Sequence, residues 1–159
     1  MRAHARLALS VYAVAGGVYL VDRATKWLVV TTLASRPPVQ VIPRVLYLNY
    51  TENPGGAFGF LGGHSWLFVG ATLAVSAGIV LMSFRVVRPV LAVAMGLVLG
   101  GALGNLTDRI VRGPELSGKV VDFIDFRVWP VFNVADSAIV IGAGLVVLAS
   151  LWHPGERPG

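Results

Sequence analysis

The chain has 159 residues, of which 55% are hydrophobic and only 13% are charged, and its mean hydropathy is +0.73. Because about 25% of the residues in a soluble domain are charged, this composition excludes an ordinary soluble protein and indicates an integral membrane protein. The formal net charge of +5 comes from dispersed basic residues, which favours contact with anionic phospholipid headgroups and argues against a nucleic-acid-binding surface.

A membrane-spanning helix needs about 20 apolar residues, and four stretches of the chain are close to this length. Within one integral-membrane domain, 1–159, they cover residues 7–30, 65–84, 89–106 and 134–152. The loops 31–64 and 107–133 are long, whereas the second and third spans are joined only by Arg85–Arg88. Each long loop follows an odd-numbered span, so we expect both loops on the same side of the membrane.

The positive-inside rule orients the spans. The short loop and the segment Arg2–Arg6 contain basic residues and no acid, which predicts that both termini are cytoplasmic. The long loops also contain basic residues, namely Arg36, Arg44, Arg112, Lys119 and Arg127. A cleaved signal peptide with a small-residue site at Ala13–Ala15 is the less favoured alternative, because that site would fall within the apolar run.

The acidic residues gather on one side of the predicted spans. Seven of the eight lie on the side of the two long loops, namely Asp22, Glu52, Asp108, Glu115, Asp122, Asp125 and Asp136. Carboxylates are expensive in or near a bilayer and usually mark a functional site. The pattern therefore predicts a site at the outer membrane boundary.

Some of these residues also have ordinary structural explanations. Asp22 and Lys26 are four residues apart on one helix face, so they can neutralise each other near the interface while the lysine extends outward. Asn133 can cap the fourth span, which would place Asp136 in its first turn near the positive end of the helix.

The third span combines small and polar residues. Its glycines recur at every fourth position, at 96, 100 and 104. This spacing predicts a flat face for close helix packing. Asn105 lies beside that face and needs hydrogen-bond partners, whereas Asp108 and Arg109 are open to interpretation as a simple interfacial ion pair.

Carboxylates are the reactive groups left in excess. The chain has no cysteine, and its three histidines are not at metal-ligand spacing, so we expect no metal and no organic cofactor. Two carboxyl groups held close together share one proton, and such a pair can hydrolyse an amide by acid–base catalysis. The loop between Asp122 and Asp136 is long enough to fold one against the other.

Five segments resemble, in chain order, the motifs of the lipoprotein signal peptidases, which are the type II signal peptidases of bacteria. They are Asp22–Lys26, Asn53–Gly59, Gly100–Arg109, Val120–Phe123 and Phe132–Ala138. The resemblance extends over residues 22–142. It implies an aspartyl peptidase of the bacterial inner membrane that removes the signal peptide of a diacylglyceryl-modified prolipoprotein, cutting just before the lipidated cysteine near the extracytoplasmic face.

The resemblance also implies roles for individual residues and a fold. Asp122 and Asp136 would be catalytic, and the residues expected to bind substrate or support the site are Asp22, Lys26, Asn53, Asn105, Arg109 and Asn133. The implied fold is an all-α membrane protein, with four transmembrane helices and a small extracytoplasmic β-sheet cradle. Residues 39–42 and 45–50 can supply strands. We expect the lipid-modified prolipoprotein and membrane phospholipids as partners, no nucleic acid, and a monomer.

Two departures from the family pattern stand out, namely Pro54 and the long turn 112–118. Two other classes of protein also stay open. A proton-coupled transporter would use intramembrane carboxylates, but the acids gather at one face rather than along a path. A non-catalytic four-helix scaffold leaves that gathering unexplained.

Overall fold

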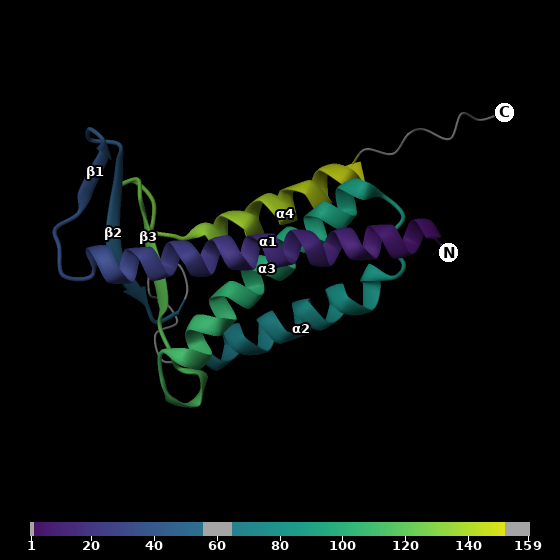
Figure 1. The fold of residues 1–159 in the computed structure, drawn as a ribbon, viewed down its shortest axis with the longest axis horizontal. Helices are drawn as coiled ribbons and strands as arrows, with labels where there is room; N and C mark the ends of the chain where they lie inside the picture. The colour runs from purple at the N-terminus through teal and green to yellow at the C-terminus, as the bar shows by residue number, and fades with distance from the viewer. Residues whose placement is uncertain (1, 56–64, 152–159) are drawn as a thin grey trace.

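The computed structural model describes residues 2–55 and 65–151, which form four helices and a small sheet (Figure 1). The helices are α1 (Arg2–Leu33), α2 (Ser65–Ser83), α3 (Pro89–Val111) and α4 (Val134–Leu151), with a short 3-10 helix, η2 (Pro114–Leu116). The strands are β1 (Val39–Ile42), β2 (Leu46–Asn53) and β3 (Val120–Asp125). The predicted fold class, four membrane-spanning helices with a small sheet, is confirmed.

All four long helices are long and apolar enough to cross a membrane. The predicted span at residues 89–106 was too short, because α3 continues to Val111 and carries Asp108 and Arg109 on the helix rather than in a loop. Asp108 forms ion pairs there with Lys26 and Arg112, and these contacts stabilise the charged residues in the last turns of α3. The end of the fourth predicted span, at 152, lies outside the described residues.

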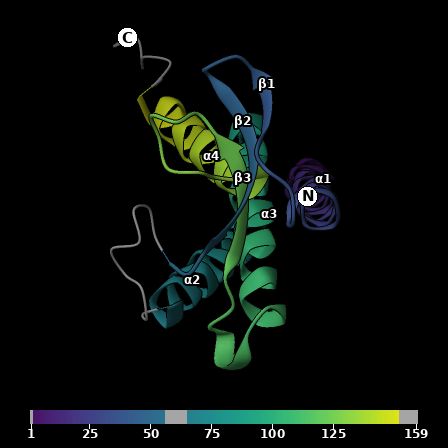
Figure 2. The same cartoon turned by 90° about the vertical axis from the view of Figure 1, so that its left-hand side faces the viewer.

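Helix α3 is the central element and packs against the other three helices, as the view from the sheet end shows (Figure 2). The predicted glycine face makes this possible. A Cβ at Gly96 would lie 2.7 Å from the carbonyl oxygen of Val11, and one at Gly100 would lie 2.5 Å from that of Ala15. Neither position has room for a side chain, so α1 approaches α3 backbone to backbone.

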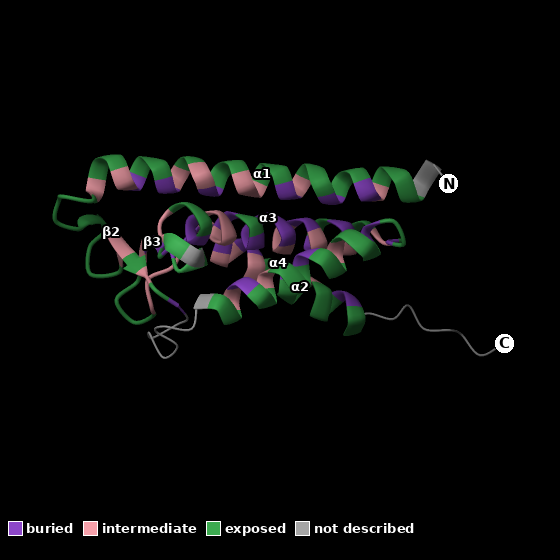
Figure 3. Ribbon diagram, turned by 90° about the horizontal axis from the view of Figure 1, so that it is seen from below, coloured by how far each residue is buried: buried purple, intermediate pink, exposed green. Residues whose placement is uncertain are grey.

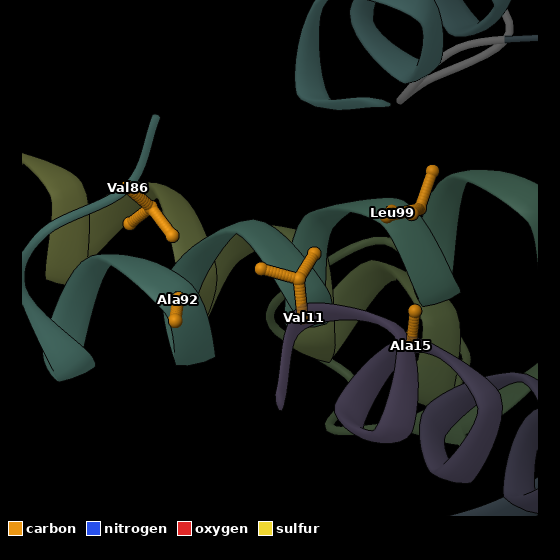
Figure 4. Close-up of a cluster of buried hydrophobic side chains, with 5 residues drawn as sticks. All are labelled: Val11, Ala15, Val86, Ala92 and Leu99. Atoms are coloured by element: carbon orange, nitrogen blue, oxygen red, sulfur yellow. The ribbon is translucent and has the colours of Figure 1, made fainter. Parts of the chain in front are cut away.

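The apolar core follows this close contact. Figure 4 shows its buried residues, which come from α1, from α3 and from the connection before α3, namely Val11, Ala15, Val86, Ala92 and Leu99. Figure 3 shows that burial is concentrated on α3 and on the side of α1 that faces it, whereas the outward faces of the helices are exposed. Those exposed faces carry large apolar residues such as Leu9 and Leu81, as lipid contact requires.

The three strands form an antiparallel sheet in the order β1-β2-β3 at the end of the bundle where α1 ends and α4 begins (Figure 1). The two predicted strands are confirmed, and the second continues to Asn53. The apolar segment around Asp122 is a strand that pairs with β2, with Thr51 opposite Asp122. Val121 and Phe123 pack with Val29 of α1, which fixes the sheet to the bundle.

Gly142 offers a test of the close packing between α3 and α4. A Cβ at Gly142 would lie 2.8 Å from the carbonyl oxygen of Ala94, so Gly142→Ala is expected to lower the free energy of unfolding by about 1–3 kcal/mol. Gly144 lies two residues further along α4 and has open space around it, so Gly144→Ala is the matched control. Equal unfolding midpoints for the two variants in detergent would contradict this packing.

Candidate active site

Two carboxylates from different elements open into one pocket. Asp122 lies in the middle of β3 and Asp136 lies in the first turn of α4. Both line a pocket of about 340 Å³ at the sheet end of the bundle, together with Asn53, Asn105 and Arg109. The structure thus brings together five of the residues that the sequence singled out.

Asn133 joins the two carboxylates. Its side-chain Nδ2 donates a hydrogen bond of 2.6 Å to Asp122 Oδ1, and its backbone N donates one of 3.2 Å to Asp136 Oδ2. Its Oδ1 accepts a hydrogen bond of 2.9 Å from the backbone N of Asp136, so the expected cap of α4 is present. The capping contact and the contact with Asp122 are made by the same buried side chain.

Two further amides occupy the remaining carboxylate oxygens. Asn53 Nδ2 donates to Asp122 Oδ2 at 2.9 Å, and Asn105 Nδ2 donates to Asp136 Oδ1 at 2.8 Å. Each of the four carboxylate oxygens therefore accepts a hydrogen bond from a neutral N–H group. Neutral donors fix the orientation of both carboxylates without adding a positive charge that would force both to ionise.

The pKa of Asp122 is raised toward neutral pH. Asp122 is only 2% exposed. This burial, together with the nearby Asp136, raises the pKa of Asp122 to about 7. The hydrogen bonds from Asn53 and Asn133 oppose this rise. Two carboxyl groups in one pocket, with one of them protonated near neutral pH, can act as an acid and a base.

Behind Asp136 lies a buried ion cluster centred on Lys26, which is fully buried. Its Nζ donates a hydrogen bond of 2.8 Å to Asn105 Oδ1 and forms ion pairs with Asp22 Oδ2 at 2.9 Å and with Asp108 Oδ2 at 3.1 Å. The expected Asp22–Lys26 pair is confirmed, but the interpretation that Lys26 extends outward is wrong. Two buried carboxylates and the half-buried amide of Asn105 hold the ammonium group inside the bundle, where these contacts compensate its desolvation.

Asp22 connects this cluster to the start of α4. Its Oδ1 accepts a hydrogen bond of 3.1 Å from the backbone N of Ala135. A Cβ at Gly104 would lie 2.5 Å from Asp22 Oδ2, so the glycine makes room for the carboxylate. Asp22 and Lys26 thus hold the first turn of α4 and the amide of Asn105, and through them they position Asp136.

Asp108 was absent from the predicted site, and so was its partner Arg23. Asp108 is fully buried, pairs with Arg23, Lys26 and Arg112, and accepts a hydrogen bond of 3.2 Å from the backbone N of Val121 in β3. The i,i+4 spacing of Asp108 and Arg112 was a signal for part of this arrangement. The contact with β3 depends on the tertiary fold and has no local signature.

Arg109 lines the pocket from α3. Its guanidinium carbon lies 5.2 Å from the centre of the Phe68 ring on α2, and its Nη1 is 3.4 Å from the carbonyl oxygens of Pro54 and Gly118. Both departures from the family pattern therefore border this arginine. The segment 56–59 of the second motif lies outside the described residues. No local pattern in the sequence indicates the other side chains that line the pocket, including Phe68, Thr72 and Trp129.

The fold and the pocket together define an integral membrane protein with a buried carboxylate pair at one end of its helix bundle. The model of the family described as signal peptidase (SPase) II matches residues 14–152. The chain therefore belongs to the signal peptidase II family, and is a bacterial membrane protease.

Individual relatives agree with this assignment. The chain is 48% identical over 136 residues to a lipoprotein signal peptidase of Pelotomaculum thermopropionicum, covering 84% of this chain and 86% of the relative. It is 45% identical over 139 residues to a lipoprotein signal peptidase of Desulfitobacterium hafniense, covering 86% of this chain and 89% of the relative. A bacterial membrane enzyme structure at 2.3 Å resolution superposes with a TM-score of 0.81 at 31% identity, covering 94% of this chain and 93% of that one.

The chain's only two lysines provide a matched test of the buried ion cluster. Lys26→Met leaves Asp22 and Asp108 without their shared cation, so the free energy of unfolding is expected to fall by about 3–5 kcal/mol. Lys119 pairs with Glu52 at 3.1 Å, but 54% of its side chain is exposed, so Lys119→Met is expected to change little. Similar losses in both variants, measured by unfolding in detergent, would refute the cluster's structural role.

Proposed function

We propose that this protein is an aspartic endopeptidase that removes the signal peptide of diacylglyceryl-modified prolipoproteins, cutting just before the lipidated cysteine. The observation that carries the proposal is the hydrogen-bonded connection from Asp122 through Asn133 to Asp136 inside one pocket. The relatives described above are lipoprotein signal peptidases, which supports the substrate class.

In the proposed reaction the two carboxyl groups share one proton. The ionised carboxylate takes a proton from water while the water oxygen attacks the carbonyl carbon of the scissile bond. The protonated carboxyl group donates its proton to the carbonyl oxygen. The C–N bond of the resulting diol then breaks, the proton taken from water passes to the leaving nitrogen, and a hydroxyl proton returns to the pair. The pair ends the cycle with one proton, as it began.

The surrounding residues have positioning or binding roles in this proposal. Asn53, Asn105 and Asn133 orient the two carboxylates through the hydrogen bonds described above. Asp22 and Lys26 act through Asn105 and the first turn of α4. Arg109, whose guanidinium borders the pocket, offers hydrogen-bond donors to the backbone of the bound substrate.

The depth of the pocket suits a lipid-linked substrate. Three tryptophans at the sheet end are strongly exposed, with Trp27 at 66%, Trp66 at 65% and Trp129 at 65%. Exposed tryptophans at one end of a helix bundle are typical of the membrane–water interface. Acyl chains anchored in the bilayer would hold the scissile bond at this level, which is catalysis by positioning.

Orientation and assembly complete the proposal. The basic, acid-free connection before α3 supports an orientation with both termini in the cytoplasm and the pocket near the extracytoplasmic face of the inner membrane. Both carboxylates and all three asparagines come from one chain, so a monomer surrounded by phospholipid provides the whole site.

The test uses full-length enzyme in detergent with a diacylglyceryl-modified prolipoprotein. Asp122→Asn and Asp136→Asn are each expected to lower the cleavage rate by at least about a hundredfold, because each removes the acid or the base. Asp125→Asn is the matched control, since Asp125 lies on the same strand but pairs with Arg127 at 3.4 Å. The mass of the product reports the position of the cut.

Unfolding measurements on the same samples separate loss of chemistry from loss of structure. The proposal is wrong if folded Asp122→Asn and Asp136→Asn enzymes cleave as fast as the control. A cut elsewhere than before the lipidated cysteine would overturn the proposed cleavage position. Equal cleavage of a precursor without the lipid would overturn the positioning role of the acyl chains.

A further inference from the structure

The end of the bundle opposite the sheet has a different charge from the active-site end. Ion pairs hold most of the basic side chains near the sheet, for example Arg23 with Asp108 and Lys119 with Glu52. At the opposite end lie Arg6, Arg85 and Arg88, and the described part of the chain places no acidic side chain there. Within residues 2–55 and 65–151, no carboxylate therefore offsets the charges of Arg6 and Arg85 at this end.

A pocket of about 560 Å³ lies at this positive end and is lined by His4, Ala5, Phe84 and Arg85. Its lining residues come from the start of α1 and from the connection between α2 and α3, two segments that Figure 1 shows at the same end of the bundle. His4 Nδ1 donates a hydrogen bond of 3.2 Å to the carbonyl oxygen of Val86, which holds the two segments together. The site for the peptidase reaction is at the other end of the bundle and shares none of these residues.

Arg85 and Arg88 differ in how their side chains are used. Arg88 Nη1 donates a hydrogen bond of 2.7 Å to the carbonyl oxygen of Ala149 near the end of α4, so Arg88 has a structural task. Arg85 is exposed, and its guanidinium forms no hydrogen bond or ion pair with any residue in the ranges 2–55 and 65–151. Its five N–H donors are available to a ligand.

Beside Arg85 the pocket is lined by the exposed ring of Phe84, which follows the exposed apolar end of α2. Phe84 is 65% exposed, and Leu81 and Met82, just before it on α2, are 73% and 54% exposed. A ligand that contacts both Arg85 and Phe84 must therefore carry negative charge next to hydrocarbon. A phospholipid with an anionic headgroup has this combination, because its phosphodiester lies directly above its acyl chains.

We propose that the pocket lined by His4, Ala5, Phe84 and Arg85 binds the headgroup of an anionic phospholipid at the membrane face opposite the active site. Arg85 binds the phosphodiester through its guanidinium fork, and Phe84 packs against the first carbons of the acyl chains. The His4 ring, fixed by its bond to Val86, forms the opposite wall. This site is independent of the peptidase reaction and does not rest on the proposed substrate.

The test measures lipid binding to the full-length protein in detergent by native mass spectrometry, with phosphatidylglycerol as the probe. Phosphatidylcholine with the same acyl chains is the control lipid. The wild type is expected to bind the anionic lipid more tightly than phosphatidylcholine, and Arg85→Gln is expected to weaken that binding by about fivefold, as loss of one arginine contact at a membrane surface does.

Arg6→Gln is the matched control variant, because Arg6 is exposed at the same end of α1 and does not line the pocket. It removes the same charge and is expected to leave the affinity within twofold of the wild type. Equal weakening by Arg85→Gln and Arg6→Gln would overturn the proposal in favour of diffuse attraction to the positive end. Equal affinity of the wild type for the two lipids would overturn it as well.

Discussion

The site depends on one buried asparagine that holds two carboxylates. Asn133 contacts Asp122 on β3 through its side chain and Asp136 on α4 through its backbone, so strand and helix meet at a single residue. Two like charges in a buried pocket repel each other, and the neutral amides around them lower this cost without removing the need for a shared proton. The cap that starts α4 and the geometry proposed for catalysis therefore share one residue, Asn133.

The rest of the fold supports this contact from behind. Glycines on α3 let α1 come close enough for Asp22 and Lys26 to reach the interior at the level of Asn105. The ammonium group of Lys26 donates a hydrogen bond to the amide oxygen of Asn105. This contact orients the amide nitrogen of Asn105 toward Asp136. Close helix packing, a buried ion cluster and an oriented carboxylate are thus successive links in one chain of contacts.

Much of this arrangement could be predicted from the sequence, since apolar length indicates the four helices and the Gly96–Gly104 spacing indicates the packed face. The cap formed by Asn133 is also local and was predicted. The burial of Lys26 could not be predicted, because an i,i+4 pair near a helix end has the same sequence pattern whether it faces lipid, water or another helix. The contact of Asp108 with β3 was missed for a similar reason, since two segments meet only after the sheet has docked on the bundle.

We expect Asp122 and Asp136 to hold one proton between them at neutral pH. Infrared difference spectroscopy between wild type and Asp122→Asn measures it directly, through the carbonyl stretch of a protonated carboxyl group. Since the pKa of Asp122 is raised to about 7, the band is expected to be strong below that pH and to fade as the pH rises through it. A wild-type spectrum without a protonated carboxyl band between pH about 5 and 7, where an unperturbed carboxyl group has already ionised, would show that the two aspartates share no proton.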